Sequence, residues 1–233
     1  MRIFVGQLAA GDVAIRGDEH HYVSRVRRAR VGDAIELVDG AGKRARGVIE
    51  KIGEAETVVR VDGVEEIADV LPRVRAIVPW IKGDRMDTCV EKLVEVGVDE
   101  IVVWPAVHAV VKLDGKRLTS RVEHYAALAQ AAARQSGRAS VPSLIAVTSL
   151  ADAITRLPAG GARVALDPGA DRGAWPSAAD VSIISGPEGG LAPAEHDALA
   201  AASFISLGLG PRVLRAETAP VIAVALVRAA TQS

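Results

Sequence analysis

In the C-terminal two thirds of the chain, from about residue 73, short apolar runs alternate with amphipathic segments. Residues 74–78 are apolar apart from Arg75, a pattern that favours a strand buried on both faces. After Asp84, which we expect to cap a helix, apolar side chains recur at helical spacing until Gly97. Further strands are predicted at 101–104, 164–166, 181–185 and 204–207, and further helices at 116–135, 193–202 and 217–230. This alternation predicts an α/β domain with a parallel sheet between two layers of helices.

The first 70 residues follow a different pattern. Short runs with β character at 3–5, 34–38, 45–51 and 57–61 are separated by turns rich in Gly and Asp. The spacing predicts a small all-β barrel. Val70-Leu71-Pro72 suits a linker, because proline restricts the residue before it. We therefore expect two domains, 1–70 and 73–233.

Composition narrows the class of protein. The 233 residues are 49% apolar and 24% charged, as in ordinary globular proteins, and the net charge of −1 gives no global attraction to nucleic acid or membrane. The single cysteine, Cys89, excludes an internal disulfide and a cysteine-based zinc cluster. We find no signal peptide and no apolar run long enough to span a bilayer, so we expect a soluble, cytoplasmic protein.

Two glycine-containing segments are the candidates for chemistry. One runs from Ile183 to Gly190 and contains Gly186-Pro-Glu-Gly-Gly190; the other runs from Leu207 to Ala219. Each begins where a predicted strand ends, which is where open α/β sheets place ligands. Two such loops on neighbouring strands could surround one flat ligand, although a pair of tight turns and a helix cap would produce the same residues.

Familiar catalytic motifs are missing from the sequence. It contains no G-x-G-x-x-G after a strand, no G-x-x-x-x-G-K-[ST], no G-x-S-x-G and no H-E-x-x-H. The five histidines do not fall at a convincing metal-ligand spacing. The residues by themselves therefore indicate a binding site without a familiar nucleophile or metal.

At these loops the sequence resembles the RsmE-type RNA methyltransferases of the SPOUT superfamily. The matching segments are Gly186-Pro-Glu-Gly-Gly190 and Gly210-Pro-Arg-Val-Leu-Arg-Ala-Glu-Thr-Ala219. Supporting matches appear in the same order along the chain: Arg25-Val-Arg-Arg28, Glu91-Lys-Leu-Val-Glu-Val-Gly-Val98, Lys112-Leu-Asp-Gly-Lys-Arg-Leu118 and Gln135-Ser-Gly-Arg138. A lone G-P-E-G-G would be weak, but the ordered set covers almost the whole chain.

The resemblance implies a specific fold and activity. Members of this family carry the methyl group of S-adenosyl-L-methionine (SAM) to N3 of one uridine in small-subunit (16S) ribosomal RNA, either as RNA or within the 30S particle. They have a PUA-like RNA-binding barrel followed by an α/β methyltransferase domain with a trefoil knot, they act as homodimers, and they need no metal. The alternatives are a SPOUT methyltransferase acting on tRNA or another base, and a non-catalytic RNA-binding protein.

Candidate site residues follow from the loops and the resemblance. Arg215 is the leading catalytic candidate, because a fixed cation beside a uracil oxygen would stabilise the deprotonated ring; an ion pair with Glu217 is the alternative. Glu217 is a second catalytic candidate, although the proton acceptor stays open. The expected cofactor-binding residues are Leu166, Ser185, Gly186, Pro187, Glu188, Gly189, Gly190, Leu207, Gly208, Gly210, Val213, Leu214, Thr218 and Ala219. The expected RNA-binding residues are Arg25, Arg28, Arg30, Lys43 and Arg138.

Two positions depart from the family's pattern. His108-Ala109 stands where an arginine-serine pair is usual, and Arg134 stands where a carboxylate is usual. Both departures fall in segments expected to flank the RNA or the partner subunit, so they affect substrate contacts more than the cofactor site.

Overall fold

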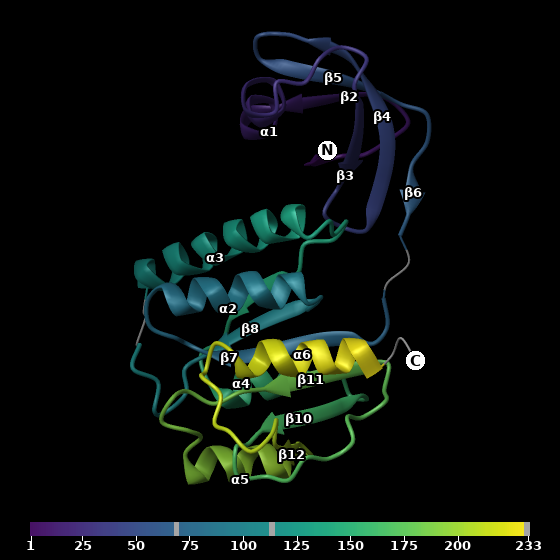
Figure 1. Ribbon diagram of the computed structural model, residues 1–233. Coiled ribbons are helices and arrows are strands. Elements are labelled where there is room, and N and C mark those ends of the chain that lie inside the picture. Colours follow the sequence, from purple (N-terminus) through teal and green to yellow (C-terminus); the bar gives the residue numbers. More distant parts are fainter. Residues whose placement is uncertain (68–69, 112–114, 231–233) are drawn as a thin grey trace. The chain divides into compact units, whose positions relative to one another are not determined.

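The chain forms two compact units in the computed structural model, which describes residues 1–67, 70–111 and 115–230 (Figure 1). The first unit comprises Met1–Asp69 together with Ala133–Val141, and the second comprises Val70–Ala132 and Pro142–Ser233. Sequence patterning did not group 133–141 with the N-terminal residues. An isolated bridge between Gly40 and Ser140 contributes to that grouping.

The first unit is built on a mixed six-stranded sheet. Its strands are β1 (Arg2–Phe4), β2 (Gly11–Arg16), β3 (Ala34–Val38), β4 (Lys43–Ile52), β5 (Glu56–Val61) and β6 (Glu65–Glu66). The order is β1-β3-β4-β5-β2, with β6 beside β4; β1 runs parallel to β3, and the other pairs are antiparallel. Alternate residues such as Ile15, Leu37 and Ile49 point into one aliphatic core.

Helical structure in the first unit was not expected from the sequence. A short helix α1 (Gly17–His21) continues into a π-helical turn η1 (Tyr22–Val26). His20 is buried there, and its ring nitrogens contact the Thr57 hydroxyl at 2.9 Å and the Glu54 carbonyl at 3.2 Å. Its two polar partners make burial of this imidazole acceptable.

The second unit contains an all-parallel sheet of six strands. They are β7 (Arg73–Pro79), β8 (Glu100–Trp104), β9 (Ser143–Ala146), β10 (Ala162–Leu166), β11 (Asp180–Ile184) and β12 (Ile205–Leu207). The order is β12-β10-β11-β7-β8-β9. The predicted parallel α/β architecture is therefore confirmed, and β10 lies between the two strands that precede the glycine loops.

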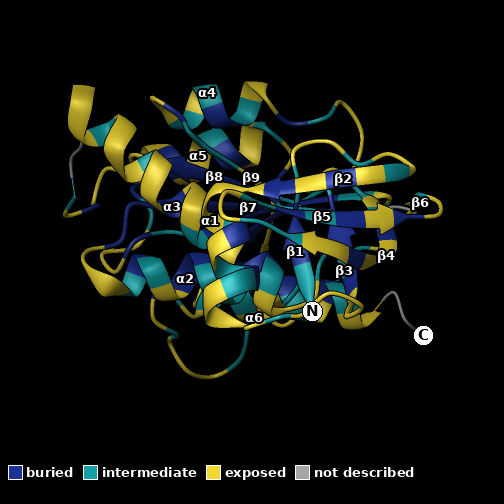
Figure 2. Cartoon of the chain, turned by 90° about the horizontal axis from the view of Figure 1, so that it is seen from above, coloured by how far each residue is buried: buried dark blue, intermediate teal, exposed yellow. Residues whose placement is uncertain are grey.

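Five helices accompany this sheet: α2 (Asp84–Glu95), α3 (Gly115–Gln135), α4 (Leu150–Thr155), α5 (Pro193–Ala201) and α6 (Ala219–Ala230). Helices α2 and α6 contact each other, and α6 also contacts β7 and β11. Apolar residues of α4 and α5, such as Ala153 and Leu199, join a core with Ile77 and Ile184 of the sheet. In Figure 2 the strands are largely dark blue, whereas α3 is yellow along much of its length.

Several element boundaries differ from the predictions. Gly83, with φ +66°, precedes α2, so Asp84 is the first helical residue and not the cap. Helix α6 begins at Ala219, which leaves Glu217 and Thr218 in the preceding turn. Strand β9 and helix α4 were not predicted. No helix within the described ranges has both the length and the apolar character that crossing a membrane requires.

Candidate functional site

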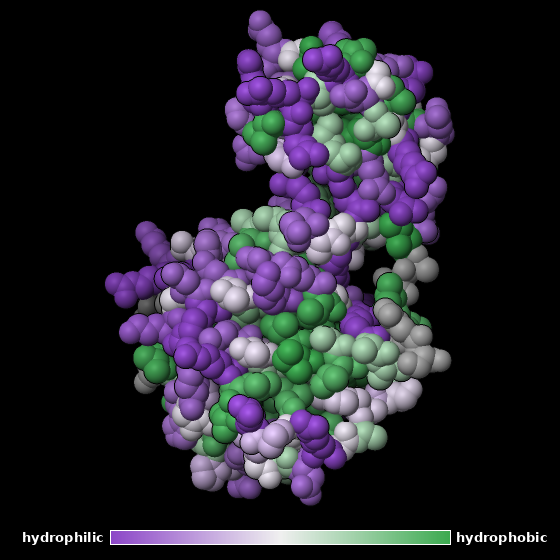
Figure 3. All heavy atoms as spheres, viewed as in Figure 1, coloured by the Kyte–Doolittle hydropathy of each residue, from purple (hydrophilic) through white to green (hydrophobic). Residues whose placement is uncertain are grey.

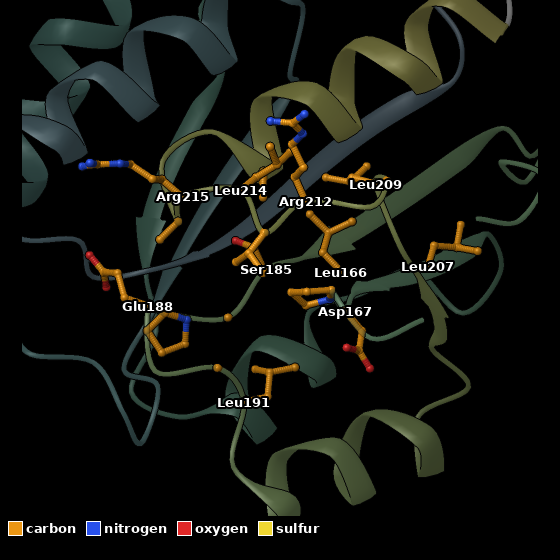
Figure 4. A pocket seen from close by; sticks show the side chains of 18 of the residues that line it. Leu166, Asp167, Ser185, Glu188, Leu191, Leu207, Leu209, Arg212, Leu214 and Arg215 are labelled. Carbon is orange, nitrogen blue, oxygen red and sulfur yellow. The ribbon is translucent and has the colours of Figure 1, made fainter. Parts of the chain in front are cut away.

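A pocket of about 400 Å³ opens where three parallel strands of the second unit end (Figure 4). Leu166 ends β10, Leu207 ends β12, and Ser185 directly follows β11. The loops after these strands form the walls. This volume lies within the usual range for small-molecule sites, and the position is the one that open α/β sheets use for ligands.

The pocket brings together most of the predicted cofactor residues. Those that line it are Leu166, Ser185, Gly186, Pro187, Glu188, Gly190, Leu207, Gly210, Val213, Leu214 and Ala219, and the predicted catalytic Arg215 joins them. The predicted residues outside the lining are Gly189, Gly208, Glu217 and Thr218. Seven further residues line the pocket and were not among the expected cofactor-binding residues: Asp167, Pro168, Leu191, His196, Leu209, Arg212 and Ala216. The strand predicted at 164–166 was the available signal for Asp167 and Pro168, which follow it directly.

The first glycine loop places an unsatisfied hydroxyl in the pocket. The amide of Ser185 donates to the Ile77 carbonyl at 3.0 Å, and the amide of Gly190 donates to Pro187 at 2.8 Å, so both ends of the loop are fixed. The Ser185 hydroxyl is buried and has no hydrogen-bond partner among the described residues. Such a group is costly unless a ligand satisfies it, and it is therefore a candidate ligand contact.

The conformation of the second glycine loop is determined by a neighbouring segment of the protein, residues 167–173. The Gly208 amide donates to the Asp171 carbonyl at 3.1 Å, and a Cβ added at Gly208 would collide with the carbonyl oxygen of Ala170. Gly210 has φ +139°, a conformation that favours glycine. Glycine at 208 is thus required by the approach of the 167–173 segment, and sequence analysis had attributed it to the approach of a ligand.

A buried carboxylate joins the first glycine loop to the loop after β8. Glu195, 6% exposed at the start of α5, accepts the Val107 amide at 2.8 Å and the Ala192 amide at 2.7 Å. His108, one of the two departures from the family's pattern, consequently lies against the glycine loop, with Nδ1 3.2 Å from the Gly190 carbonyl. Glu195 had no role in the sequence analysis, because its partners are backbone amides far apart in the chain.

Arg215 carries an uncompensated positive charge at the pocket. Its side chain is exposed, and within the described ranges it forms no ion pair or hydrogen bond. The alternative considered from the sequence, pairing with Glu217, does not occur in this structure. Arg212 also lines the pocket, and Figure 4 shows the two arginine side chains extending in different directions.

Glu217 instead faces helix α2. One carboxylate oxygen lies 3.9 Å from Arg85 Nη1, and this same oxygen is buried without a hydrogen bond. Arg85 Nη1 also lies 2.8 Å from a carboxylate oxygen of Glu188. Burial raises the pKa of the Cys89 thiol to about 12, and the nearby negative charge of Glu217 adds to the rise. Glu217 therefore lies beside α2, near both Arg85 and the buried thiol.

The predicted RNA-binding arginines lie on a helical turn of the first unit. Arg25 belongs to η1, Arg27 ends it, and Arg28 has φ +51°, which is unusual outside glycine. None of these arginines lies on a strand, so they do not share a strand face as alternating residues would. Arg25, Arg27, Arg28 and Arg30 are exposed and have no ion pair among the described residues.

The remaining basic candidates for RNA binding differ in whether their side chains are exposed or already interact within the protein. Lys43 is exposed at the start of β4, whereas the neighbouring Arg44 pairs with Glu65 at 2.8 Å. Arg138 is partly buried and already interacts within the protein. Lys112, in the segment 112–118 that carried part of the resemblance, lies outside the described residues.

Arg134, the second departure from the family's pattern, has a structural contact within the first unit. It pairs with Glu19, and its guanidinium lies 5.9 Å from the Phe4 ring centre and 5.6 Å from the Tyr22 ring centre. Burial raises the pKa of the Glu19 carboxyl, and the charge of Arg134 opposes that rise. Arg134 therefore attaches the end of α3 to the N-terminal sheet.

Comparison with known proteins connects this site with a family. A family model described as an RNA methyltransferase domain matches residues 69–228, and one described as an RNA methyltransferase PUA domain matches residues 15–61. Ribosomal RNA small subunit methyltransferase E of Mycobacterium tuberculosis is 34% identical over 226 residues, covering 93% of this chain and 86% of that protein. The chain belongs to the ribosomal RNA small subunit methyltransferase E family.

More distant members of the methyltransferase E family agree along the full chain. The Bacillus subtilis protein is 28% identical over 94% of this chain and 90% of its own length. The crystal structure of the Neisseria gonorrhoeae protein, bound to S-adenosyl methionine, has a TM-score of 0.87 and 25% identity, covering 98% of this chain and 97% of that chain. The family assignment predicted from the glycine loops is therefore confirmed.

Proposed function

We propose that this methyltransferase E family member transfers the methyl group of SAM to N3 of a uridine in 16S ribosomal RNA. The observation that carries the proposal is the pocket at the ends of β10, β11 and β12, which combines an apolar wall with an arginine that is unpaired among the described residues. The named relatives act on small-subunit ribosomal RNA, and one is solved with SAM bound. Ribosomal RNA as substrate also makes the cytoplasm the expected location.

The pocket residues suit SAM in size and chemistry. Leucines 166, 191, 207, 209 and 214 provide an apolar surface for an adenine ring, and the buried Ser185 hydroxyl needs a polar partner. Gly186, Pro187 and Gly190 bring the main chain to the pocket edge. We assign cofactor binding to these lining residues. Gly189, Gly208 and Thr218 support the loops from outside the lining.

The protein's own contribution to the reaction is to stabilise a deprotonated base. When bound, SAM supplies a methyl group on a positively charged sulfur. N3 of uracil becomes nucleophilic after its imide proton passes to solvent, and the negative charge then spreads to the neighbouring carbonyl oxygens. The Arg215 guanidinium remains charged and can donate two parallel hydrogen bonds, so it would hold one of those oxygens and stabilise the anion.

The apolar residues of the pocket would favour the reaction between the deprotonated uracil, which is negatively charged, and the positively charged sulfonium group of SAM. Formation of the N3–methyl bond with loss of the methyl–sulfur bond would remove both charges, which an apolar pocket would favour. Leu207, Leu209 and Leu214 provide that setting. Glu217 lies outside the pocket lining and faces α2, so we assign it no proton-transfer step.

RNA and a second copy of the chain would complete the active protein. The exposed arginines 25, 27, 28 and 30 form a phosphate-binding surface on the first unit, with Lys43 as a further candidate. Figure 3 shows hydrophobic side chains gathered over α6 on the second unit, where Ile222 and Leu226 are each 40% exposed. Exposed apolar faces of this kind are typical of subunit interfaces, so we assign this face to a homodimer. The trefoil knot remains an expectation from the family.

Incubation with radiolabelled SAM tests the proposed function. Unmethylated 30S particles, naked 16S RNA and tRNA should be offered in parallel, with cofactor binding followed by calorimetry. We expect cofactor binding and label in the small-subunit substrates. Label only in tRNA would support a different substrate class, whereas RNA binding without cofactor binding would support a non-catalytic protein.

A further inference from the structure

Arg85 connects three elements around the pocket. It lies in the first turn of α2, and Nη1 contacts the Glu188 carboxylate at 2.8 Å and the Glu217 carboxylate at 3.9 Å. Glu188 belongs to the first glycine loop, and Glu217 belongs to the turn before α6. One cation therefore serves two carboxylates from separate loops.

Arg215 pairs with neither of these carboxylates. It stands two residues before Glu217 in the chain, and it lines the pocket together with Glu188. In Figure 4 the charged ends of Arg215 and Glu188 extend toward the same side of the pocket. Arginine and carboxylate groups pair readily through charge-assisted hydrogen bonds. Some other group must therefore keep Glu188 and Glu217 from pairing with Arg215.

We infer that Arg85 is a positioning residue that holds Glu188 and Glu217 and so keeps the Arg215 guanidinium free for the uracil ring. This inference rests on the proposed function. In the absence of Arg85, the released carboxylates would attract Arg215. The paired Arg215 would then offer less positive charge and fewer donors to the deprotonated base, although the cofactor would still find its apolar walls.

The variant Arg85→Gln tests this role. We expect the dissociation constant for SAM, measured by calorimetry, to stay within about threefold of wild type. The single-turnover rate of methyl transfer to unmethylated 30S particles should fall at least about 30-fold, because an Arg215 guanidinium paired with a carboxylate no longer stabilises the negative charge on the base. Arg85→Lys keeps the charge and should retain most of the rate.

A double-mutant cycle separates this role from simple support of the fold. In a background that carries both Glu188→Gln and Glu217→Gln the competing charges are absent, so adding Arg85→Gln should lower the rate by less than about threefold. Lys92→Gln is the matched control on the same helix: Lys92 pairs with Glu91 and Glu95 outside the pocket lining, and its loss should leave the rate unchanged. Thermal unfolding of each variant would verify that it is folded.

Three results would overturn the inference. A wild-type rate in folded Arg85→Gln would show that Arg215 does not need Arg85. An equal loss with and without the Glu188 and Glu217 carboxylates would show that they do not compete. Arg85→Lys as inactive as Arg85→Gln would show that charge is not the cause. If wild-type protein transfers no methyl group, the proposed function fails first; if it is active, these results remove only the role of Arg85.

Discussion

Charged and polar side chains at the pocket differ in whether the protein already satisfies them. Glu188 pairs with Arg85 at 2.8 Å, and Glu195 accepts two backbone amides. Glu217 lies 3.9 Å from the same arginine, and one of its carboxylate oxygens is buried without a hydrogen bond in the described structure. Arg215 and the Ser185 hydroxyl have no such partner in the described structure. The satisfied groups fix the loops, and the unsatisfied groups are the ones that a ligand can contact.

Replacement of Arg215 by alanine should affect chemistry more than cofactor binding. We expect the turnover rate to fall about 100-fold, the usual effect of removing one donor to a developing negative charge, while the SAM dissociation constant changes less than about threefold. Arg156→Ala is a suitable control, because Arg156 is ion-paired to Asp152 outside the pocket lining. Equal losses of affinity and turnover would instead place Arg215 in the cofactor site.

Gly208→Ala should destabilise the fold even before any ligand is considered. The added methyl group would collide with the Ala170 carbonyl, so we expect the free energy of unfolding in denaturant to fall by about 1–3 kcal/mol. Gly160→Ala is the matched control, since nothing lies within 4 Å of its added Cβ. An unchanged stability for Gly208→Ala would show that the 167–173 segment can move away from the loop.

At the level of elements, sequence patterning worked best where apolar runs were long and buried. Strands β7, β8, β10 and β11 were predicted because most of their side chains are apolar, as expected for strands buried on both faces of a sheet. Strand β9 has four residues, none fully buried, and its pattern was too weak to detect. Helix α4 did have a signal, because the Ser149 hydroxyl accepts the Asp152 amide as a helix cap.

The candidate site could be predicted only in part, because local sequence patterns locate loops but not contacts between residues that are far apart in the chain. Loops that follow buried strands were found from chain order alone, and with them most of the pocket lining. The contact of Arg85 with Glu188 and the contact of Glu195 with Val107 join residues that are remote in sequence. No local periodicity encodes such pairs, so only the folded structure shows them.

The arginine turn at η1 should contribute to RNA affinity through charge. Reversing Arg25 and Arg28 to glutamate should weaken binding of 16S RNA about tenfold or more and reduce its dependence on salt, because fewer counterions are released. Arg16→Glu is a control in the same unit, since Arg16 is already paired with Glu56 at 2.7 Å. Unchanged affinity and salt slope in filter-binding titrations would make these arginines ordinary surface residues.

At the scale of the whole molecule, two units share one continuous helix. Residues of α3 up to Ala132 belong to the second unit, and the helix ends in the first, where Arg134 contacts Glu19, Phe4 and Tyr22. The domain boundaries proposed from the sequence, 1–70 and 73–233, did not anticipate this return of the chain. A pattern of apolar positions predicts whether a segment is a helix or a strand, but it does not predict against which hydrophobic core the segment packs.

The apolar face of α6 should determine the oligomeric state. We expect light scattering after gel filtration to give twice the 24.3 kDa mass of one chain, and Ile222→Glu with Leu226→Glu to give the single-chain mass, because buried charges oppose association. Val48→Glu, at an exposed position of the first unit, should remain dimeric. A monomeric wild-type protein would contradict the homodimer.

Mass spectrometry of the methylated nucleoside is the most direct test of the central claim. 16S RNA from 30S particles treated with SAM and the protein should be digested to nucleosides and compared with an untreated sample and with one treated with Arg215→Ala. We predict 3-methyluridine at one position, formed rapidly by the wild-type protein and about 100-fold more slowly by the variant. A methyl group on another atom or another base, or equal rates for the two proteins, would contradict an arginine-stabilised attack by uridine N3.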